Sequence, residues 1–206
     1  MNRSDDPYAL TLGALEERVN KCTKCPLSET RTHVVFGEGD PHADLMLVGE
    51  GPGEVEDNTG HPFVGPAGHK LDDVLSSVGI SRAEIYITNV VKCRPPGNRV
   101  PTKKEMEACS PYLEAQIALV NPKLIITLGN TPTQWLVPGA GGITHIHGSF
   151  IPWRGGIEIV PMFHPSYLLR NPSRSKGSPK YLTWMDIKKV RKWLDDNGRQ
   201  RDSDRL

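Results

Sequence analysis

Four apolar runs punctuate this chain, and polar or amphipathic stretches separate them. The runs cover residues 43–49, 85–91, 124–128 and 157–163 and are rich in Leu, Ile and Val. Apolar runs of this length, bounded by glycine, proline and polar residues, are typical of strands that are buried on both faces of a sheet. We therefore predict four buried strands.

Apolar residues at helical spacing mark the segments between these runs. Thr102 precedes Glu105 by three positions, which resembles the capping box of a helix start. The predicted helices cover residues 10–19, 66–78, 102–120, 129–136 and 181–194.

The alternation of strands and helices predicts an α/β fold. We expect a three-layer α/β/α sandwich around a mostly parallel four-stranded sheet. The chain has 206 residues, which is enough for one domain with a proper core and hardly enough for two. We assign residues 1–197 to this single domain and expect the polar tail, residues 198–206, to be disordered.

The charge and the N-terminus narrow the class of protein. The formal net charge is +1, so a nucleic-acid partner would have to be held by local basic patches. The start Met-Asn-Arg-Ser-Asp-Asp-Pro has no apolar core of a signal peptide, and the apolar runs are too short to span a bilayer. We expect a monomeric cytoplasmic protein, in which disulfides are not the default use of cysteine.

Polar and aromatic residues of chemical interest follow three of the predicted strands. Residues 48–71 turn through three glycines, carry several carboxylates and present Phe63 before a helix that starts near Pro66. Asn89 lies late in the second strand, where strand propensity disfavours Asn, and His164 follows the fourth strand. Because ligands bind beyond the carboxyl ends of parallel strands, these residues predict a site.

Each of these residues alone also has an ordinary structural explanation. A single loop Phe is usually part of the core, a strand Asn often lies at a bulge, and a histidine is more often at the surface than catalytic. Only their combination favours a site. The glycines also leave open a nucleotide-binding oxidoreductase, although Gly-Glu-Gly-Pro-Gly lacks the Gly-x-Gly-x-x-Gly spacing of the dinucleotide fingerprint.

The four cysteines are candidate metal ligands. Cys22 and Cys25 form a Cys-x-x-Cys pair before a proline, and Cys93 and Cys109 lie far along the chain. Four thiolates suit either zinc or an iron–sulfur cluster, and four buried apolar cysteines are the structural alternative. The Cys-x-x-Cys pair favours ligation, and spacing alone favours zinc, because Cys₄ zinc sites are the common structural solution.

Four motifs together resemble the family 4 uracil-DNA glycosylases, the iron–sulfur type. They are Gly-Glu-Gly-Pro-Gly-x-x-Glu-Asp, Pro-Phe-Val-Gly, Thr-Asn-x-Val-Lys-Cys-Arg-Pro-Pro and Phe-His-Pro-Ser-Tyr-Leu-Leu-Arg-Asn-Pro. The resemblance implies a DNA-repair enzyme that flips uracil out of single- or double-stranded DNA, hydrolyses its N-glycosidic bond and leaves an abasic site. It also implies a structural [4Fe–4S] cluster on Cys22, Cys25, Cys93 and Cys109.

The resemblance also gives roles in base recognition to residues of these motifs. Phe63 would stack on the flipped base, and Asn89 would accept from N3–H and donate to O4 of uracil. Glu50 would exclude the 5-methyl group of thymine. Gly51 is expected to contact the substrate, since glycine allows close approach of the backbone.

The chemistry of base release needs a donor and a carboxylate. His164 would stabilise the negative charge that develops on O2 of the departing base. Glu50, Glu56 and Asp57 compete for the role of orienting the attacking water, and the resemblance suggests Glu56 with Glu50 in support. No lysine in the motifs suggests a Schiff-base nucleophile, so we expect base removal without strand cleavage.

Contacts with DNA are expected from residues 167–180, which combine apolar residues, cations and small donors. Base flipping needs apolar wedges that fill the vacated stack and cations on phosphates. Leu168 and Leu169 are the wedge candidates, and Arg170, Arg174 and Lys176 are candidates for the phosphates. The structural alternative is a solvated loop, and the functional alternative is an iron–sulfur DNA-binding module without catalysis.

Overall fold

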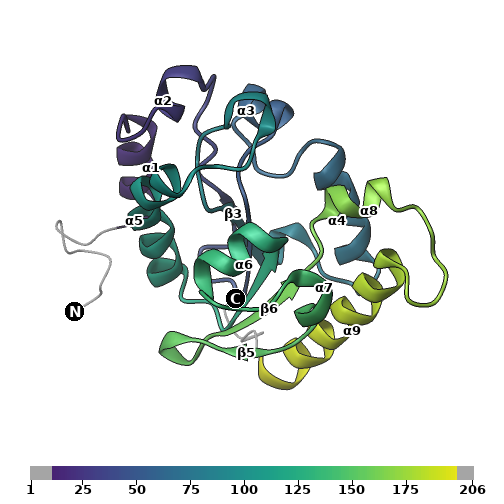
Figure 1. Ribbon diagram of the computed structural model, residues 1–206. Helices are drawn as coiled ribbons and strands as arrows, with labels where there is room; N and C mark the ends of the chain where they lie inside the picture. Colours follow the sequence, from purple (N-terminus) through teal and green to yellow (C-terminus); the bar gives the residue numbers. More distant parts are fainter. Residues whose placement is uncertain (1–10, 199–206) are drawn as a thin grey trace, which may run out of the picture.

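The structure is a computed structural model that describes residues 11–198, in which strands and helices alternate (Figure 1). None of its helices combines the length and the apolar character needed to cross a bilayer. The strands are β1 (Glu38–Gly39), β2 (Leu45–Gly49), β3 (Ile85–Asn89), β4 (Leu124–Leu128), β5 (Ile151–Pro152) and β6 (Glu158–Met162). The α-helices are α1 (Leu12–Asn20), α2 (Leu27–Thr30), α3 (Glu54–Thr59), α4 (Pro66–Ser76), α5 (Lys103–Val120), α6 (Asn130–Leu136), α7 (Ile143–Ile146), α8 (Pro165–Arg170) and α9 (Pro179–Asn197). The 3-10 turns in the described residues are η2 (Arg82–Glu84), η3 (Pro96–Asn98) and η4 (Arg154–Gly156).

A sheet of six strands, in the order β1-β3-β2-β4-β6-β5, forms the centre of the described chain. The strands β3, β2, β4 and β6 pair in parallel and match the four predicted strands. The edge strands β1 and β5 are antiparallel to their neighbours and have two residues each. The predicted four-stranded sheet is therefore corrected to six strands. Two residues are too few to leave a hydrophobic period in the sequence.

Helices cover both faces of this sheet, because alternate side chains of a strand point to opposite sides. Met46 and Val48 of β2 belong to a core shared with α1, α5 and α6, whereas Leu45 and Leu47 belong to a core shared with α4 and α9. Figure 1 shows these two groups of helices on opposite sides of the strands. The predicted single-domain α/β fold is confirmed.

The predicted helices are present with shifted ends, and four short helices in residues 11–198, α2, α3, α7 and α8, are additional. The capping box is confirmed: the Glu105 N–H donates to the Thr102 hydroxyl at 3.3 Å, and the Thr102 N–H donates to the Glu105 carboxylate at 2.7 Å. Helices α3 and α8 have six residues each, which is too short for a helical period to stand out. Position 10 of the first predicted helix and positions 199–206 of the predicted tail lie outside the described residues.

Candidate functional site

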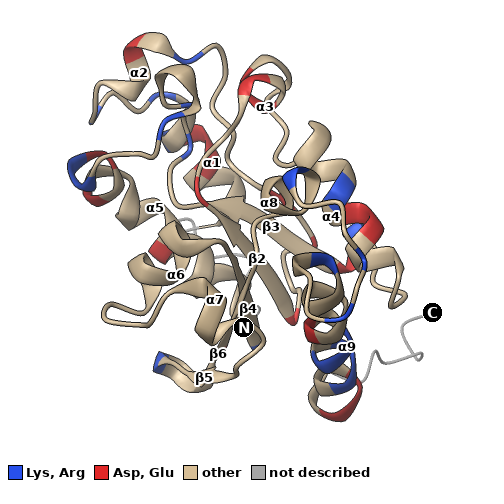
Figure 2. Cartoon of the chain, turned by 45° about the vertical axis from the view of Figure 1, so that its right-hand side comes forward, with Lys and Arg blue, Asp and Glu red and all other residues tan. Residues whose placement is uncertain are grey.

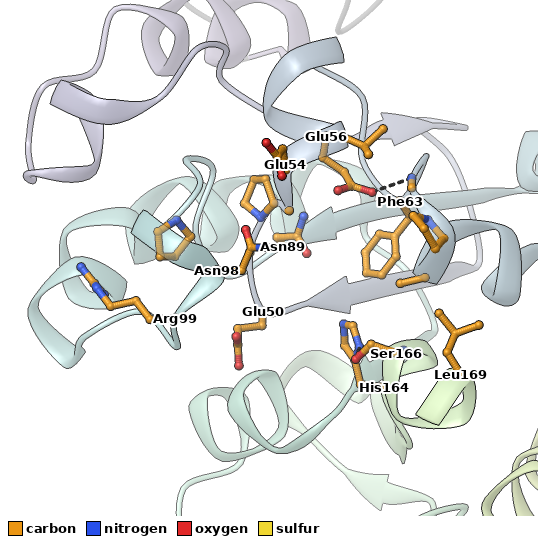
Figure 3. Close-up of a pocket in the computed structure, with 18 of the residues that line it drawn as sticks. Glu50, Glu54, Glu56, Phe63, Asn89, Asn98, Arg99, His164, Ser166 and Leu169 are labelled. Carbon is orange, nitrogen blue, oxygen red and sulfur yellow. Dashed lines mark hydrogen bonds between the residues drawn. The ribbon is translucent and has the colours of Figure 1, made fainter. Parts of the chain in front are cut away.

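A cavity of about 530 Å³ lies beyond the carboxyl ends of the parallel strands. Figure 3 shows side chains from separate parts of the chain around it. Asn89 ends β3, Glu50 follows β2, Glu56 comes from α3, Phe63 comes from the loop before α4, and His164 precedes α8. The structure thus brings together the predicted residues of base recognition and chemistry, including Gly51.

Asn89 presents an unpaired acceptor to this cavity. Its residue is 1% exposed, and its side-chain oxygen Oδ1 has no hydrogen-bond partner among the described residues. Gly49 faces Asn89 across the β2–β3 pair. A Cβ atom at Gly49 would lie 2.3 Å from Asn89 Oδ1 and 2.5 Å from Phe63 Cζ, so this position requires glycine. A buried acceptor without a partner is costly, which indicates that a ligand supplies the donor.

Phe63 is held in an unusual backbone conformation at the wall of the cavity. Its φ angle is 53°, in the left-handed region, which is an outlier for a bulky residue and costs on the order of 1–3 kcal/mol. The ring is buried, and its centroid lies 6.2 Å from that of His164. Such strain persists only where surrounding groups fix it, and it points to a function.

Glu56 supplies one of these fixing contacts. Its Oε1 atom accepts hydrogen bonds from the backbone N–H groups of Val64 at 3.0 Å and Gly65 at 2.8 Å. Figure 3 marks one of these bonds with a dashed line. The carboxylate therefore ties α3 to the loop that carries Phe63. This contact occupies Oε1 and leaves Oε2 without a hydrogen bond to those two groups.

The other two carboxylates have different surroundings. Glu50 lines the cavity and accepts a short hydrogen bond from the hydroxyl of Thr131 in α6. Asp57 is buried and accepts from the backbone N–H of Thr32, at 2.9 Å and 3.1 Å to its two oxygens. Since Asp57 does not line the cavity, only Glu50 and Glu56 remain of the three competing carboxylates.

His164 is the N-cap of α8, and this position fixes its tautomer. The backbone N–H of Ser166 donates to His164 Nδ1 at 3.1 Å, and the Ser166 hydroxyl lies 2.7 Å from the same nitrogen. A nitrogen that accepts carries no proton, so the neutral ring has its proton on Nε2. Burial lowers the pKa of His164 to about 4; the charge of Arg170 acts in the same direction and Glu56 acts against it. The imidazole is therefore a neutral Nε2–H donor at pH 7.

Helix α8 separates the two predicted wedge residues. Leu169 is 42% exposed and lines the cavity together with Arg170. Leu168 is 1% exposed and packs in the core, so its prediction as a wedge is wrong. Successive residues of a helix point in directions about 100° apart, so two adjacent leucines can face different surroundings, and in α8 only Leu169 faces outward. Arg174 is exposed in the loop after α8, outside the cavity lining.

Two residues near the site have functions that the sequence does not indicate. Ser166 holds the His164 ring, and Thr131 holds Glu50. Ser166 stands inside a quoted motif, two positions after the histidine, and this N-cap spacing is the one signal that could identify it. Thr131 is 81 positions from Glu50, so no local pattern connects them.

The four cysteines gather at a second, smaller cavity. Cys22 and Cys25 come from the segment between α1 and α2, Cys93 follows β3, and Cys109 is in α5, and all four line this cavity. None of the four forms a disulfide. Within residues 11–198, no three His, Cys, Asp or Glu side chains converge on a position for a single metal ion.

Two cations accompany these cysteines. Arg31 Nη1 donates to Cys93 Sγ at 3.3 Å and to the Cys22 carbonyl oxygen at 2.8 Å. Lys92 is fully buried, lines the same cavity and donates to the Asn89 carbonyl oxygen at 2.6 Å. Burial raises the pKa of the Cys109 thiol to about 11, although the neighbouring Lys92 acts to lower it. A buried lysine and a partly buried arginine next to cysteines fit a group that carries negative charge.

The class of protein follows from a family model. The model described as the uracil DNA glycosylase superfamily matches residues 36–188, a span that includes Glu50, Phe63, Asn89 and His164. The match covers more than half of the chain and most of the residues around the cavity.

Similar proteins narrow the class further. The chain is 48% identical over 185 residues to the type-4 uracil-DNA glycosylase of Thermotoga maritima, with 89% of this chain and 95% of that protein covered. It is 42% identical over 189 residues to the type-4 uracil-DNA glycosylase of Sulfurisphaera tokodaii, with 88% and 84% covered. A type-5 uracil-DNA glycosylase of Thermus thermophilus is 31% identical over 151 residues, with 64% and 68% covered. The chain belongs to the type-4 uracil-DNA glycosylase family.

Proposed function

We propose that this protein is a DNA-repair glycosylase that flips uracil out of DNA, hydrolyses its N-glycosidic bond and leaves an abasic site. One observation carries the proposal: the buried, unpaired Oδ1 of Asn89 lies in a cavity lined by Phe63 and by the neutral His164. We further propose that it acts as a monomer in the cytoplasm on single- or double-stranded DNA, which gel filtration, cell fractionation and matched substrates would test.

Base recognition uses the hydrogen-bonding edge of uracil and the face of its ring. Uracil offers the N3–H donor that Asn89 Oδ1 lacks, and the Asn89 amino group donates to O4. Phe63 supplies the ring on which the base stacks. The backbone at Gly51 contacts the substrate, and Glu50, held by Thr131, excludes the 5-methyl group of thymine.

Base release depends on a hydrogen-bond donor, His164, and on a negatively charged carboxylate, Glu56. His164 directs its Nε2–H toward O2 of the leaving uracil, where negative charge develops as the glycosidic bond breaks. The sugar becomes cation-like, and the carboxylate of Glu56 stabilises it and orients the attacking water, with Glu50 in support. No lysine lines the cavity in the described part of the chain, which supports release of the base without strand cleavage.

Contacts with the DNA backbone complete the proposal. Leu169 fills the space that the flipped base vacates, and Arg170 and Arg174 bind phosphates. Figure 2 shows further lysine and arginine positions along α9. Helix α3 argues against a dinucleotide cofactor after β2, because acidic residues fill its first turn and would repel a pyrophosphate.

The four cysteines suit a [4Fe–4S] cluster, which the resemblance to the iron–sulfur type of this family implies. They line one cavity, and Arg31 and Lys92 supply positive charge beside it. We propose that Cys22, Cys25, Cys93 and Cys109 hold such a cluster, which serves as a structural cross-link.

The first experiment uses an end-labelled oligonucleotide with one uracil, incubated with the protein and then treated with alkali to cut at abasic sites. We expect cleavage only after alkali, and none with a thymine-matched oligonucleotide. Cleavage before alkali would contradict the monofunctional reaction. Retained DNA binding by iron-loaded protein without any base release would instead favour the non-catalytic DNA-binding module.

A further inference from the structure

Arg82 lies outside the cavity and contacts the backbone of the loop that carries Phe63. Its Nη2 atom donates to the Pro62 carbonyl oxygen at 2.7 Å, and its Nη1 atom donates to the Phe63 carbonyl oxygen at 2.8 Å. Both ends of the guanidinium fork therefore hold consecutive carbonyl groups. Arg82 starts η2, the turn that leads into β3 and so to Asn89.

The same guanidinium is fixed from behind by two carboxylates. Nη1 also donates to Asp72 of α4 at 3.1 Å, and Nη2 donates to Glu38 of β1 at 3.3 Å. The Arg82 side chain is 29% exposed, so the charge of these ion pairs is partly screened. The contact therefore depends on the planar, fixed geometry of the guanidinium group more than on its charge alone.

The loop that carries Phe63 packs closely against the first turn of α4. A movement of the loop backbone would therefore also move the Phe63 ring. A Cβ atom at Gly68 would lie 1.8 Å from the Phe63 carbonyl oxygen, so the first turn of α4 rests directly on this carbonyl. Arg82 holds the carbonyl oxygens of Pro62 and Phe63, and Glu56 holds the N–H groups of the two residues after Phe63. The left-handed Phe63 is thus fixed by polar contacts on both sides of its position.

We propose that Arg82 is a positioning residue for base recognition, which keeps the Phe63 ring at the angle required for stacking on the flipped uracil. This inference rests on the proposed function. It extends the recognition of the base to a residue that lines no part of the cavity.

The test compares Arg82→Met, Arg82→Lys and the matched surface control Arg154→Met, all on iron-loaded full-length protein. Equilibrium dialysis with labelled uracil measures the affinity of the base site. Arg82→Met should weaken uracil binding about tenfold, the scale of a lost charged hydrogen bond, and should slow base release in single turnover. Arg82→Lys should keep more uracil affinity than Arg82→Met, but it should recover less than half of the loss in binding free energy. The reason is that an ammonium group cannot hold two carbonyl groups in a fixed geometry. Affinity for an abasic oligonucleotide should change less than twofold in every variant.

A double-mutant cycle with Phe63→Ala separates positioning from general loosening of the fold. If Arg82 acts through Phe63, adding Arg82→Met to Phe63→Ala should weaken uracil binding by less than twofold further. Additive losses, or equal losses for uracil and for abasic DNA, would overturn the proposal. If the unaltered protein binds uracil but releases none from DNA, the proposed function fails while the binding cycle still decides the role of Arg82.

Discussion

His164 depends on its backbone neighbour as much as on its own chemistry. Because the Ser166 N–H occupies Nδ1, the ring offers Nε2–H to the cavity without needing a positive charge. Burial and Arg170 also disfavour the imidazolium form. At the residue scale, the site is therefore a set of neutral, oriented donors and acceptors with the carboxylates of Glu50 and Glu56 beside them.

Replacement of His164 tests this donor. His164→Ala should lower the single-turnover rate of uracil release by about 10²–10³-fold, the usual effect of removing one preorganised donor at a developing oxyanion. His145→Ala, at an exposed histidine outside the cavity, is the matched control and should keep the rate of the unaltered protein. A rate within threefold of normal in His164→Ala protein, with normal iron content and melting temperature, would remove His164 from the mechanism.

The lowered pKa of His164 makes a prediction about pH. Since the folded value is about 4, the ring should stay neutral, with its proton on Nε2, from pH 8 down to pH 5. Nitrogen-15 NMR of histidine-labelled protein, assigned with His164→Ala, should show this tautomer throughout. Protonation of the ring with a midpoint near 6.5 would contradict the buried donor. The pKa of His164 is lower in the folded state than in the unfolded state. Its contribution to the free energy of unfolding is therefore complete above about pH 6.5 and is lost as the pH falls toward 4.

The residues predictable from sequence are those that violate a local rule. Asn89 is conspicuous because a strand interior disfavours Asn, and His164 is conspicuous because it follows a strand directly. Thr131 and Arg82 could not be predicted, since their partners are distant in sequence. The two adjacent leucines could not be distinguished until α8 placed one of them in the core.

At the scale of elements, two short helices carry much of the site. Helix α3 presents Glu56, and α8 presents Leu169 and Arg170 with His164 as its N-cap. Neither helix has an apolar period of its own, so the sequence predicts loops there. The four central strands were predictable because each is a short run rich in apolar and β-branched residues. The sequence thus predicts the framework of the fold better than the elements that complete the site.

Glu56 joins two of these elements, and its two roles can be separated. Glu56→Gln keeps an oxygen that can accept from Val64 and Gly65 but removes the charge. We expect it to slow base release about 10–100-fold while uracil affinity changes less than threefold. Glu56→Ala should lose both rate and affinity, because the Phe63 loop loses an anchor. Equal uracil release by Glu56→Gln and unaltered protein would show that the charge has no part in the reaction.

At the scale of the whole molecule, the four cysteines come from three separate segments of the chain and line one cavity. Cys22 and Cys25 precede the sheet, Cys93 starts the proline-rich loop and Cys109 belongs to α5. A cluster at this position would close long loops of the chain, which lowers the entropy of the unfolded state. The cavity that the cysteines line lies near the strand end that carries Asn89, because Lys92 lines this cavity and donates to the Asn89 carbonyl oxygen.

Loss of a ligand should therefore reduce stability before chemistry. Cys109→Ala should lower iron content and melting temperature, with at least 2 kcal/mol lost from the free energy of unfolding, the typical scale of a lost structural cross-link. Visible absorbance, iron analysis and thermal unfolding measure these effects. Ser28→Ala, beside the same cavity, is a control that should keep its iron. Iron-free Cys109→Ala protein with normal stability and activity would contradict the structural role.

The close packing around Gly49 limits which substitutions the site can tolerate. A single methyl group there would reach into the space between the Asn89 amide and the Phe63 ring, while the cysteines and the exposed cations of α8 and α9 would remain as they are. Gly49 is thus a position in the site where even one added methyl group would collide with its neighbours. We therefore expect Gly49→Ala to keep its affinity for DNA and to lose release of the base, which binding and single-turnover assays would measure.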